Sequence, residues 1–570
     1  MVETSGRLRR WSQAAGSGVV LCVGAGVLLF YVNRLFAELP LYAGDEGAYL
    51  INALYARERA WAPQVYPSVQ PVANTLYFAI VRLVDALSLN VIPWMRLIGA
   101  LSYFGGLALL YLVAARECGR KLAAGFLLIA ALFPYYRFAF AAMPDGVYAG
   151  LLCLVAFVVY RVYATRPLLG AALVGGLAAA LVLVKPHGVV VVPAFVALCL
   201  VQAVVGRGPI PPVLARLALF AAAFMAVGAG IELAAGRSLE QAMTFFRGSA
   251  YAQHLGQEAV ARAPAMAALS AASMGGLCAV LLSVPLVAAV AGWLRDRREG
   301  PGVLSAGGLA LLFVALCLAG TLAMVTIFAF RMAGIEAETR RLWGRYFEFY
   351  TPMLWLLAAR PLAVWERLAT TRGRLLAAAG VIAGLGALLG VFALGVRLFP
   401  WDGTAVTAFA APDVVAFPFG DLGGSRLIAV LATAAVALAT LAGVSVRAAW
   451  PAYFVVLGLL STRADDAWVG EIAQRWRAIE HELHVADALA VERAAPAVVF
   501  VDGLNEGHVA YLRLRGRAII RLASPGPIAE DALAGFNSAV VIGPHPIGEG
   551  WRTVFEGREL TIYAREAPAQ

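Results

Sequence analysis

The chain is built from apolar runs about as long as a membrane is thick, with basic residues between them. Of its 570 residues, 61% are hydrophobic and 14% are charged, and the mean hydropathy is +0.78. Soluble domains carry about 25% charged residues, whereas a helix that spans a bilayer needs about 20 apolar residues. These features predict a polytopic α-helical membrane protein and argue against a soluble enzyme.

The net charge of +10 does not indicate a nucleic-acid partner. The arginines stand between apolar runs with little aromatic residue interleaving, where the positive-inside tendency of membrane proteins explains them. The cysteines occur singly, without CxxC or CxxH spacing, so the sequence predicts neither a zinc site nor a disulfide framework. The six cysteines are Cys22, Cys118, Cys153, Cys199, Cys278 and Cys317.

About 13 spans are expected from run length and charge. Arg7, Arg9 and Arg10 precede an uncleaved first span over about 16–36, which places the N-terminus in the cytoplasm. The further predicted spans are 94–115, 122–141, 147–163, 168–184, 188–205, 217–234, 266–294, 304–330, 346–365, 375–397, 426–446 and 449–461.

Residues 73–90 resemble a short span but carry Arg82 and Asp85. If this segment crossed the membrane, every later basic loop would face outside. We therefore expect a juxtamembrane helix in a long first external loop.

The composition changes near Thr462, so we expect two domains, a transmembrane catalytic domain over 1–461 and a soluble extracytoplasmic α/β domain over 462–570. Residues 465–490 have the period of an amphipathic helix. Short apolar runs bounded by Gly, Pro and Asn predict strands over 498–501, 518–520 and 539–542.

Two acidic features lie on the predicted outer face. Asp45 and Glu46 follow the first span, where a paired acid costs desolvation energy and is usually functional; an ordinary loop pair is the alternative. Asp145 follows Met143-Pro144 at the outer end of the third span. It suits a substrate site, a helix N-cap, or both.

Basic residues on the same predicted face suggest a phosphate ligand. Lys185 lies deep in apolar sequence beside His187, and it is either a snorkelling lysine or a counter-charge for a lipid phosphate. His187 alone is more often a hydrogen-bonding residue than a base. An arginine cluster departs from the positive-inside tendency and could grip phosphate bidentately, unless Glu336, Glu338 and Glu348 neutralise it. The cluster consists of Arg331, Arg340, Arg341 and Arg345, followed by Tyr346.

At these positions the sequence resembles the GT-C superfamily of polyprenyl-phosphate-sugar-dependent glycosyltransferases, and within it the aminoarabinose transferases of lipid A and the protein O-mannosyltransferases. The resemblance covers about 1–365. Its motifs are GDEGAYL at 44–50, the helix of the first external loop, PDG at 144–146, VKPHG at 184–188 and GRYFEFYTP at 344–352. It departs from the family pattern at Gln70-Pro71-Val72, before the juxtamembrane helix.

The resemblance implies a GT-C fold and an inverting transfer from a polyprenyl-phosphate sugar to a hydroxyl of an envelope glycan, lipid or protein, at the outer face of the inner membrane. It makes Asp45 the base and Asp145 the second-loop acid of the catalytic site. We expect Glu46 to be a supporting residue of the same site, with its role left open. The residues expected at the donor phosphate are Lys185, His187, Arg340, Arg341, Arg345 and Tyr346. A Mg²⁺ or Mn²⁺ ion is an open alternative, but we favour metal-independent chemistry because the second loop offers one acid.

Two rival functions remain. A transporter or flippase of lipid-linked sugars would also need many spans and outward cations, but it predicts internal repeats and charges near the mid-membrane, which the sequence lacks. In a non-catalytic envelope scaffold the acids would merely cap helices. Sugar transfer from a polyprenyl-phosphate donor separates the enzyme from both.

Overall fold

The computed structural model describes part of the chain, and the side chains of some residues near its gaps, including Asp45, lie outside that part. The described residues are 25–27, 29–33, 45–54, 74–134, 136–206, 210–247, 263–299, 304–331, 341–368, 370–399, 402–415, 423–491, 497–501, 506, 510, 518–521 and 526–565.

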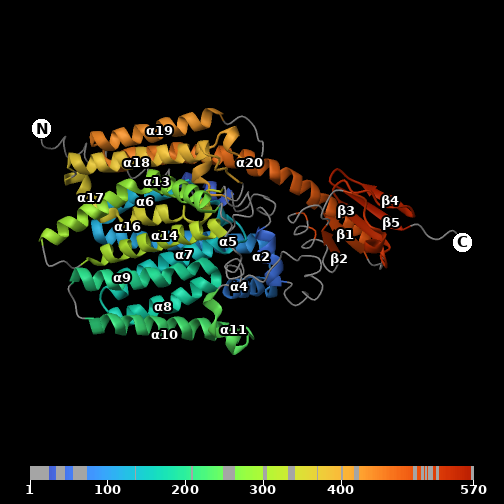
Figure 1. Cartoon of the computed structure of the whole chain (residues 1–570), viewed down its shortest axis with the longest axis horizontal. Helices are drawn as coiled ribbons and strands as arrows, with labels where there is room; N and C mark the ends of the chain where they lie inside the picture. The colour runs from blue at the N-terminus through green and yellow to red at the C-terminus, as the bar shows by residue number, and fades with distance from the viewer. Residues whose placement is uncertain are drawn as a thin grey trace, which may run out of the picture.

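Long helices lie side by side in a bundle, and a small sheet stands beyond one end of it (Figure 1). Within the described ranges, nine helices are long and apolar enough to cross a membrane. They are Val91–Cys118, Pro144–Tyr163, Pro167–Val184, Pro186–Val205, Pro211–Ala234, Ala268–Arg297, Ala306–Ala329, Thr371–Ala393 and Ser425–Ala442.

The α-helices of the bundle have these bounds: α2 Asp45–Leu54, α4 Thr75–Ala86, α5 Val91–Cys118, α6 Arg120–Leu132, α7 Pro144–Val158, α8 Pro167–Val184, α9 Val191–Gly206, α10 Ile210–Ala234, α11 Leu239–Met243, α13 Ala263–Glu299, α14 Ala306–Arg331, α16 Tyr350–Leu357, α17 Ala359–Leu368, α18 Thr371–Ala393, α19 Gly423–Ala442 and α20 Val446–Val491. The short helices are η1 Arg137–Phe140, η2 Val159–Tyr163, η3 Pro186–Val190, η4 Phe245–Arg247, η5 Gly344–Tyr346, η6 Ala405–Phe409, η7 Pro412–Val414 and η8 Glu530–Leu533.

Nine of the predicted spans therefore correspond to long apolar helices, and a total of thirteen stays a prediction. Three predicted spans have other forms. In 122–141, α6 ends at Leu132 and η1 follows; 346–365 is divided between α16 and α17; and 449–461 lies inside α20. The predicted first span falls largely outside the described residues, although 25–27 and 29–33 are helical.

The predicted juxtamembrane helix is α4, which packs against α2 at the end of the bundle nearest the sheet (Figure 1). A small cluster of buried side chains joins the two helices, among them Leu50, Tyr77 and Val81. The long helices α5 and α7 approach closely because α7 has glycines in its first two turns. A Cβ on Gly146 would lie 2.6 Å from the carbonyl oxygen of Gly99, and one on Gly150 would lie 2.2 Å from that of Ser102. This contact fixes the start of α7, where Asp145 lies.

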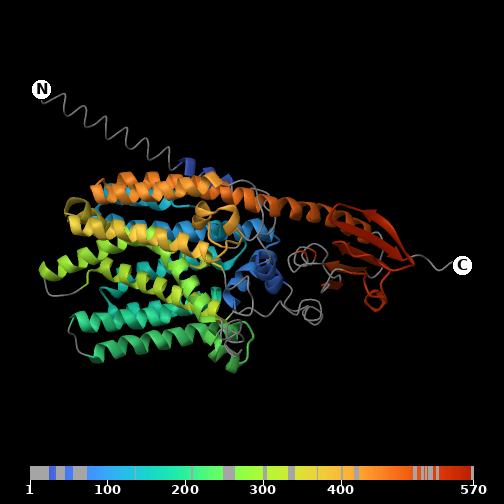
Figure 2. The same ribbon diagram turned by 45° about the horizontal axis from the view of Figure 1, so that its top comes forward.

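The helix α20 runs from the bundle to the C-terminal sheet without a break, across the predicted domain boundary at 461 (Figure 2). The sheet consists of β1 Ala497–Val501, β2 Ala518–Arg521, β3 Ser538–Ile542, β4 Trp551–Glu556 and β5 Leu560–Arg565, in the order β2-β1-β3-β5-β4. β1 pairs in parallel with β2 and β3, whereas β5 is antiparallel to β3 and β4. The first three match the predicted strands.

Candidate active site

Asp145, Lys185 and Arg345 form one buried ionic cluster. The Lys185 Nζ lies 2.5 Å from Oδ1 of Asp145, and Arg345 donates from Nε to Oδ1 at 3.1 Å and from Nη2 to Oδ2 at 3.0 Å. All three residues are at most 4% exposed. Residues 200 positions apart in the sequence thus meet at a single carboxylate.

The position of Lys185 follows from a break between two apolar helices. α8 ends at Val184, Lys185 is extended, and Pro186 starts η3. Gly188 allows the broken segment to lie against α8, because a Cβ there would be 2.5 Å from the carbonyl carbon of Leu181. Because of this break, the Lys185 side chain reaches Asp145 at the start of α7.

Tyr346 and His187 cover the cations of this cluster. Their rings stack with centroids 4.4 Å apart, and Lys185 Nζ lies 4.7 Å from the centroid of the Tyr346 ring. The Arg345 guanidinium carbon lies 5.7 Å from the same centroid. An aromatic face within about 6 Å of a cation stabilises its charge, so both residues belong to the cluster predicted from the sequence.

Glu46 is placed differently from the cluster acid. It is fully buried, it pairs with Arg96 through two contacts of 3.2 Å, and it accepts a hydrogen bond of 2.6 Å from the backbone N–H of Ala142. Glu46 therefore ties the first turn of α2 to the segment that leads into Asp145.

Arg341 lies away from the cluster. Arg340 lies outside the described residues, as does the side chain of Asp45. Arg341 stacks on Trp343, 3.9 Å from its ring centroid, and its Nε lies 3.4 Å from Oδ1 of Asp402. Asp402 also accepts from the backbone N–H groups of Trp343 and Phe399, at 3.1 and 3.0 Å.

The sequence did not predict that the segment around Arg137 contacts Arg345. The Tyr136 hydroxyl donates to the carbonyl oxygen of Arg345 at 2.5 Å and lies 3.4 Å from Oδ1 of Asp145. The Arg345 guanidinium lies 4.9 Å from the centroid of the Phe138 ring. Both residues fall in the predicted span 122–141, and a polar Arg137 between aromatics was the available signal that no single helix continues to residue 141.

Glu348, which the sequence suggested as a neutralising acid, precedes α16 and lies outside the nine long apolar helices. Its carboxylate accepts from the backbone N–H groups of Ala405 and Val406, at 3.0 and 3.3 Å. Burial raises the pKa of Glu348 to about 7, although these N–H groups and the nearby Arg137 oppose the rise. Burial likewise raises the pKa of Asp402, against the opposing charge of Arg341.

Metal binding is not suggested by the described residues. Among them, no three His, Cys, Asp or Glu side chains converge where an ion could bind. Asp145 uses both carboxylate oxygens on Lys185 and Arg345, and Glu46 uses both on Arg96.

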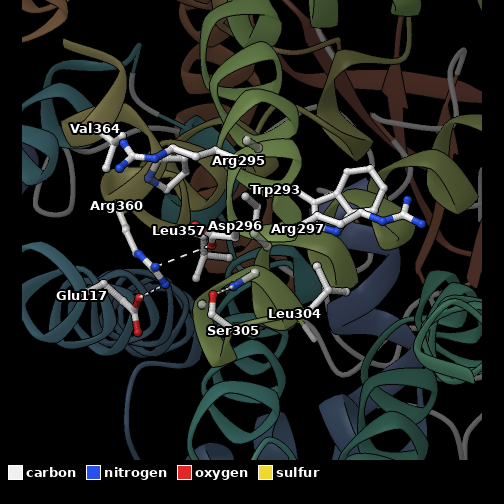
Figure 3. Close-up of a pocket in the computed structure, with 16 residues that line it drawn as sticks. Glu117, Trp293, Arg295, Asp296, Arg297, Leu304, Ser305, Leu357, Arg360 and Val364 are labelled. Atoms are coloured by element: carbon white, nitrogen blue, oxygen red, sulfur yellow. Dashed lines mark hydrogen bonds and ion pairs between the residues drawn. The ribbon is translucent and has the colours of Figure 1, made fainter. Parts of the chain in front are cut away.

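A cavity of about 180 Å³ lies away from this cluster, between the ends of α5, α13, α14 and α17 (Figure 3). Three of its charged side chains pair with one another, since Arg360 lies 3.6 Å from Glu117 and 3.5 Å from Asp296. Glu117 and Arg96 are at opposite ends of α5, about 30 Å apart at 1.5 Å per residue. The cavity is therefore at the other end of the bundle from the Asp145 cluster.

No protein-family model matches the chain, and no curated protein matches it by sequence. Two solved structures resemble it over almost its whole length, ArnT from Cupriavidus metallidurans in the apo state and the same protein bound to undecaprenyl phosphate. Both have a TM-score of 0.54, with 16% and 15% sequence identity, and they cover 97% of this chain and 100% and 99% of theirs. The expected GT-C fold is therefore confirmed, because the chain folds as ArnT does.

Proposed function

We propose that this protein is an inverting glycosyltransferase that moves a sugar from a polyprenyl-phosphate carrier to an acceptor hydroxyl. The observation that carries the proposal is the ionic cluster, in which Lys185 and Arg345 share the carboxylate of Asp145. Two cations lie side by side at this buried place. Such a site favours an anion.

The two cations suit a phosphate in complementary ways. Lys185 supplies a compact point charge, and Arg345 supplies a planar fork that fits two phosphate oxygens. During transfer the bond between the anomeric carbon and the phosphate oxygen breaks, and its electron pair stays on the phosphate. Fixed cations stabilise the charge that grows there.

Asp45 is the proposed base. It is the first residue of α2, and its neighbour Glu46 holds that turn against Ala142, three residues before Asp145. An acceptor hydroxyl loses its proton to the Asp45 carboxylate as its oxygen bonds to the anomeric carbon. The products are the glycoside, the polyprenyl phosphate and a protonated Asp45, so protons and charge balance.

The ArnT structure with undecaprenyl phosphate supports a polyprenyl carrier for a chain of this fold. We place the reaction on the extracytoplasmic face of the inner membrane, with an envelope glycan, lipid or protein as acceptor. The sheet stands beyond the end of the bundle that bears α2 and α4 (Figure 1), which supports an extracytoplasmic domain over 462–570. We assign no metal ion to the reaction.

The test is sugar transfer by purified protein in detergent, with a radiolabelled polyprenyl-phosphate sugar and an envelope extract as acceptor. We expect labelled product with the wild type and none with Asp45→Asn at unchanged expression. Near-normal turnover by Asp45→Asn would remove Asp45 from the base role. Wild-type protein that moves the donor across vesicles without transferring the sugar would favour a flippase.

A further inference from the structure

A second buried ionic cluster links three distant parts of the chain. Arg137 of η1 pairs with Asp465 of α20 and donates a hydrogen bond to the carbonyl oxygen of Asp402. All three residues are at most 1% exposed. Burying such charges costs several kcal/mol per ion, so this pairing fixes where η1 lies relative to α20.

The neighbours of Arg137 on both sides contact Arg345. Tyr136 donates to the Arg345 carbonyl oxygen, and the Phe138 ring contacts the guanidinium groups of both arginines. The centroid of that ring is 4.9 Å from the guanidinium carbon of Arg345 and 5.0 Å from that of Arg137. A displacement of Arg137 must therefore disturb the residues that orient Arg345.

The other end of the link belongs to the helix that carries the C-terminal sheet. Seventeen residues after Asp465, or about 26 Å along α20, Glu482 accepts hydrogen bonds from three backbone N–H groups at the turn between β4 and β5. These are Arg558 at 2.8 Å, Glu559 at 3.0 Å and Leu560 at 2.9 Å. The α20 helix thus binds the sheet through Glu482 and η1 through Asp465.

We propose that Asp465 is a positioning residue, which acts through Arg137 to orient the Arg345 guanidinium. In this way α20 couples the C-terminal sheet to the first ionic cluster, that of Asp145, Lys185 and Arg345. The role of Arg345 as a phosphate ligand rests on the proposed function, whereas the coupling of Asp465 to the Arg345 segment does not.

Amide hydrogen exchange tests the coupling without any ligand. Backbone N–H groups of Tyr346, Phe347 and Glu348 donate to carbonyls of Trp343 and Gly344. In full-length Asp465→Asn we expect about tenfold faster exchange at these amides, and in Asp465→Glu, which keeps the charge, a rate close to wild type. Glu482→Gln is the control, with faster exchange confined to 557–560. A folded Asp465→Asn variant within twofold of wild type at 346–348 would overturn the proposal.

If Asp465→Asn does not fold, the double variant Arg137→Met with Asp465→Leu replaces the buried pair by apolar side chains, a change that proteins often tolerate. Faster exchange at 346–348 in this double variant would support the proposal, and exchange within twofold of wild type would overturn it.

Binding of undecaprenyl phosphate separates this proposal from the proposed function. We expect Asp465→Asn to raise the dissociation constant about tenfold and Glu482→Gln to leave it unchanged. A wild type that does not bind the lipid would refute the proposed function, while the exchange result would still decide the coupling.

Discussion

Replacing Asp145 by Asn removes the carboxylate that Lys185 and Arg345 both contact. The two cationic side chains are at most 5% exposed, and their nitrogens lie 2.5 and 3.0 Å from its oxygens. Removing one partner of a buried ion pair costs about 3–5 kcal/mol. Because two cations share this carboxylate, we expect a loss near the upper end of that range.

The same variant should bind a lipid phosphate more tightly than the wild type. Asn at position 145 withdraws from Lys185 and Arg345 the negative charge of that carboxylate, which a bound phosphate can replace. If the phosphate recovers about 1.4 kcal/mol of the lost interaction, its affinity rises about tenfold. A mere N-cap role would not produce this gain, since Asn caps helices as well as Asp.

Thermal unfolding in detergent, with and without undecaprenyl phosphate, measures both effects. We expect Asp145→Asn to have a lower Tm without lipid and a larger rise on adding lipid. Asp296→Asn is the matched control, because its carboxylate is 45% exposed and pairs with Arg360 at the other end of the bundle. An Asp145→Asn variant with the wild-type Tm, or with the wild-type response to lipid, would refute the counter-ion role.

Three further predictions concern the surroundings of the cluster. Glu46→Gln should cost about 3–5 kcal/mol of stability because it removes the charge that faces buried Arg96; a denaturant titration that finds no loss would exclude this structural role. Gly188→Ala should displace Lys185 and weaken lipid-phosphate binding, whereas Gly230→Ala, where a Cβ meets nothing within 4 Å, should not; equal binding by both variants would contradict the close packing. The pKa of Glu348 is raised to about 7 in the folded protein, so the stabilisation contributed by its protonated form is lost as pH rises from about 4.5 to 7. The Tm of Glu348→Gln relative to wild type should therefore increase between pH 5 and pH 8. A constant difference would show that Glu348 does not titrate in this range.

The residues that meet in the cluster could be predicted because each is a polar exception in apolar sequence. Asp145 and Lys185 stand where proline breaks an apolar run, and Arg345 stands in a loop expected to lack basic residues. Such positions are costly without a role. The predicted set therefore named Asp145, Lys185, His187, Arg345 and Tyr346, which the fold brings together.

The pairing of acidic with basic side chains could not be predicted in the same way. Arg341 is four residues from Arg345 but pairs with Asp402, and Glu46 pairs with Arg96. These choices depend on how loops from distant helices meet. Arg137 was overlooked because averaging hydropathy over a run hides a single arginine among aromatic residues.

The fold was predicted best where apolar runs are long. In the C-terminal domain, β1, β2 and β3 are continuous apolar runs, but β4 and β5 were missed. β5 alternates buried and partly exposed residues, and β4 mixes polar and apolar residues and has no buried residue. A search for buried runs does not find strands of this kind.

The most direct test of the account is the affinity of the purified protein for undecaprenyl phosphate, compared between wild type and Lys185→Met. Met keeps the length and apolar stem of the side chain but lacks its charge, so it removes one of the two proposed phosphate ligands. We predict saturable binding by the wild type and at least about tenfold weaker binding by Lys185→Met, the loss of one charge-assisted hydrogen bond. Equal affinity of the two proteins would contradict a phosphate clamp at this cluster.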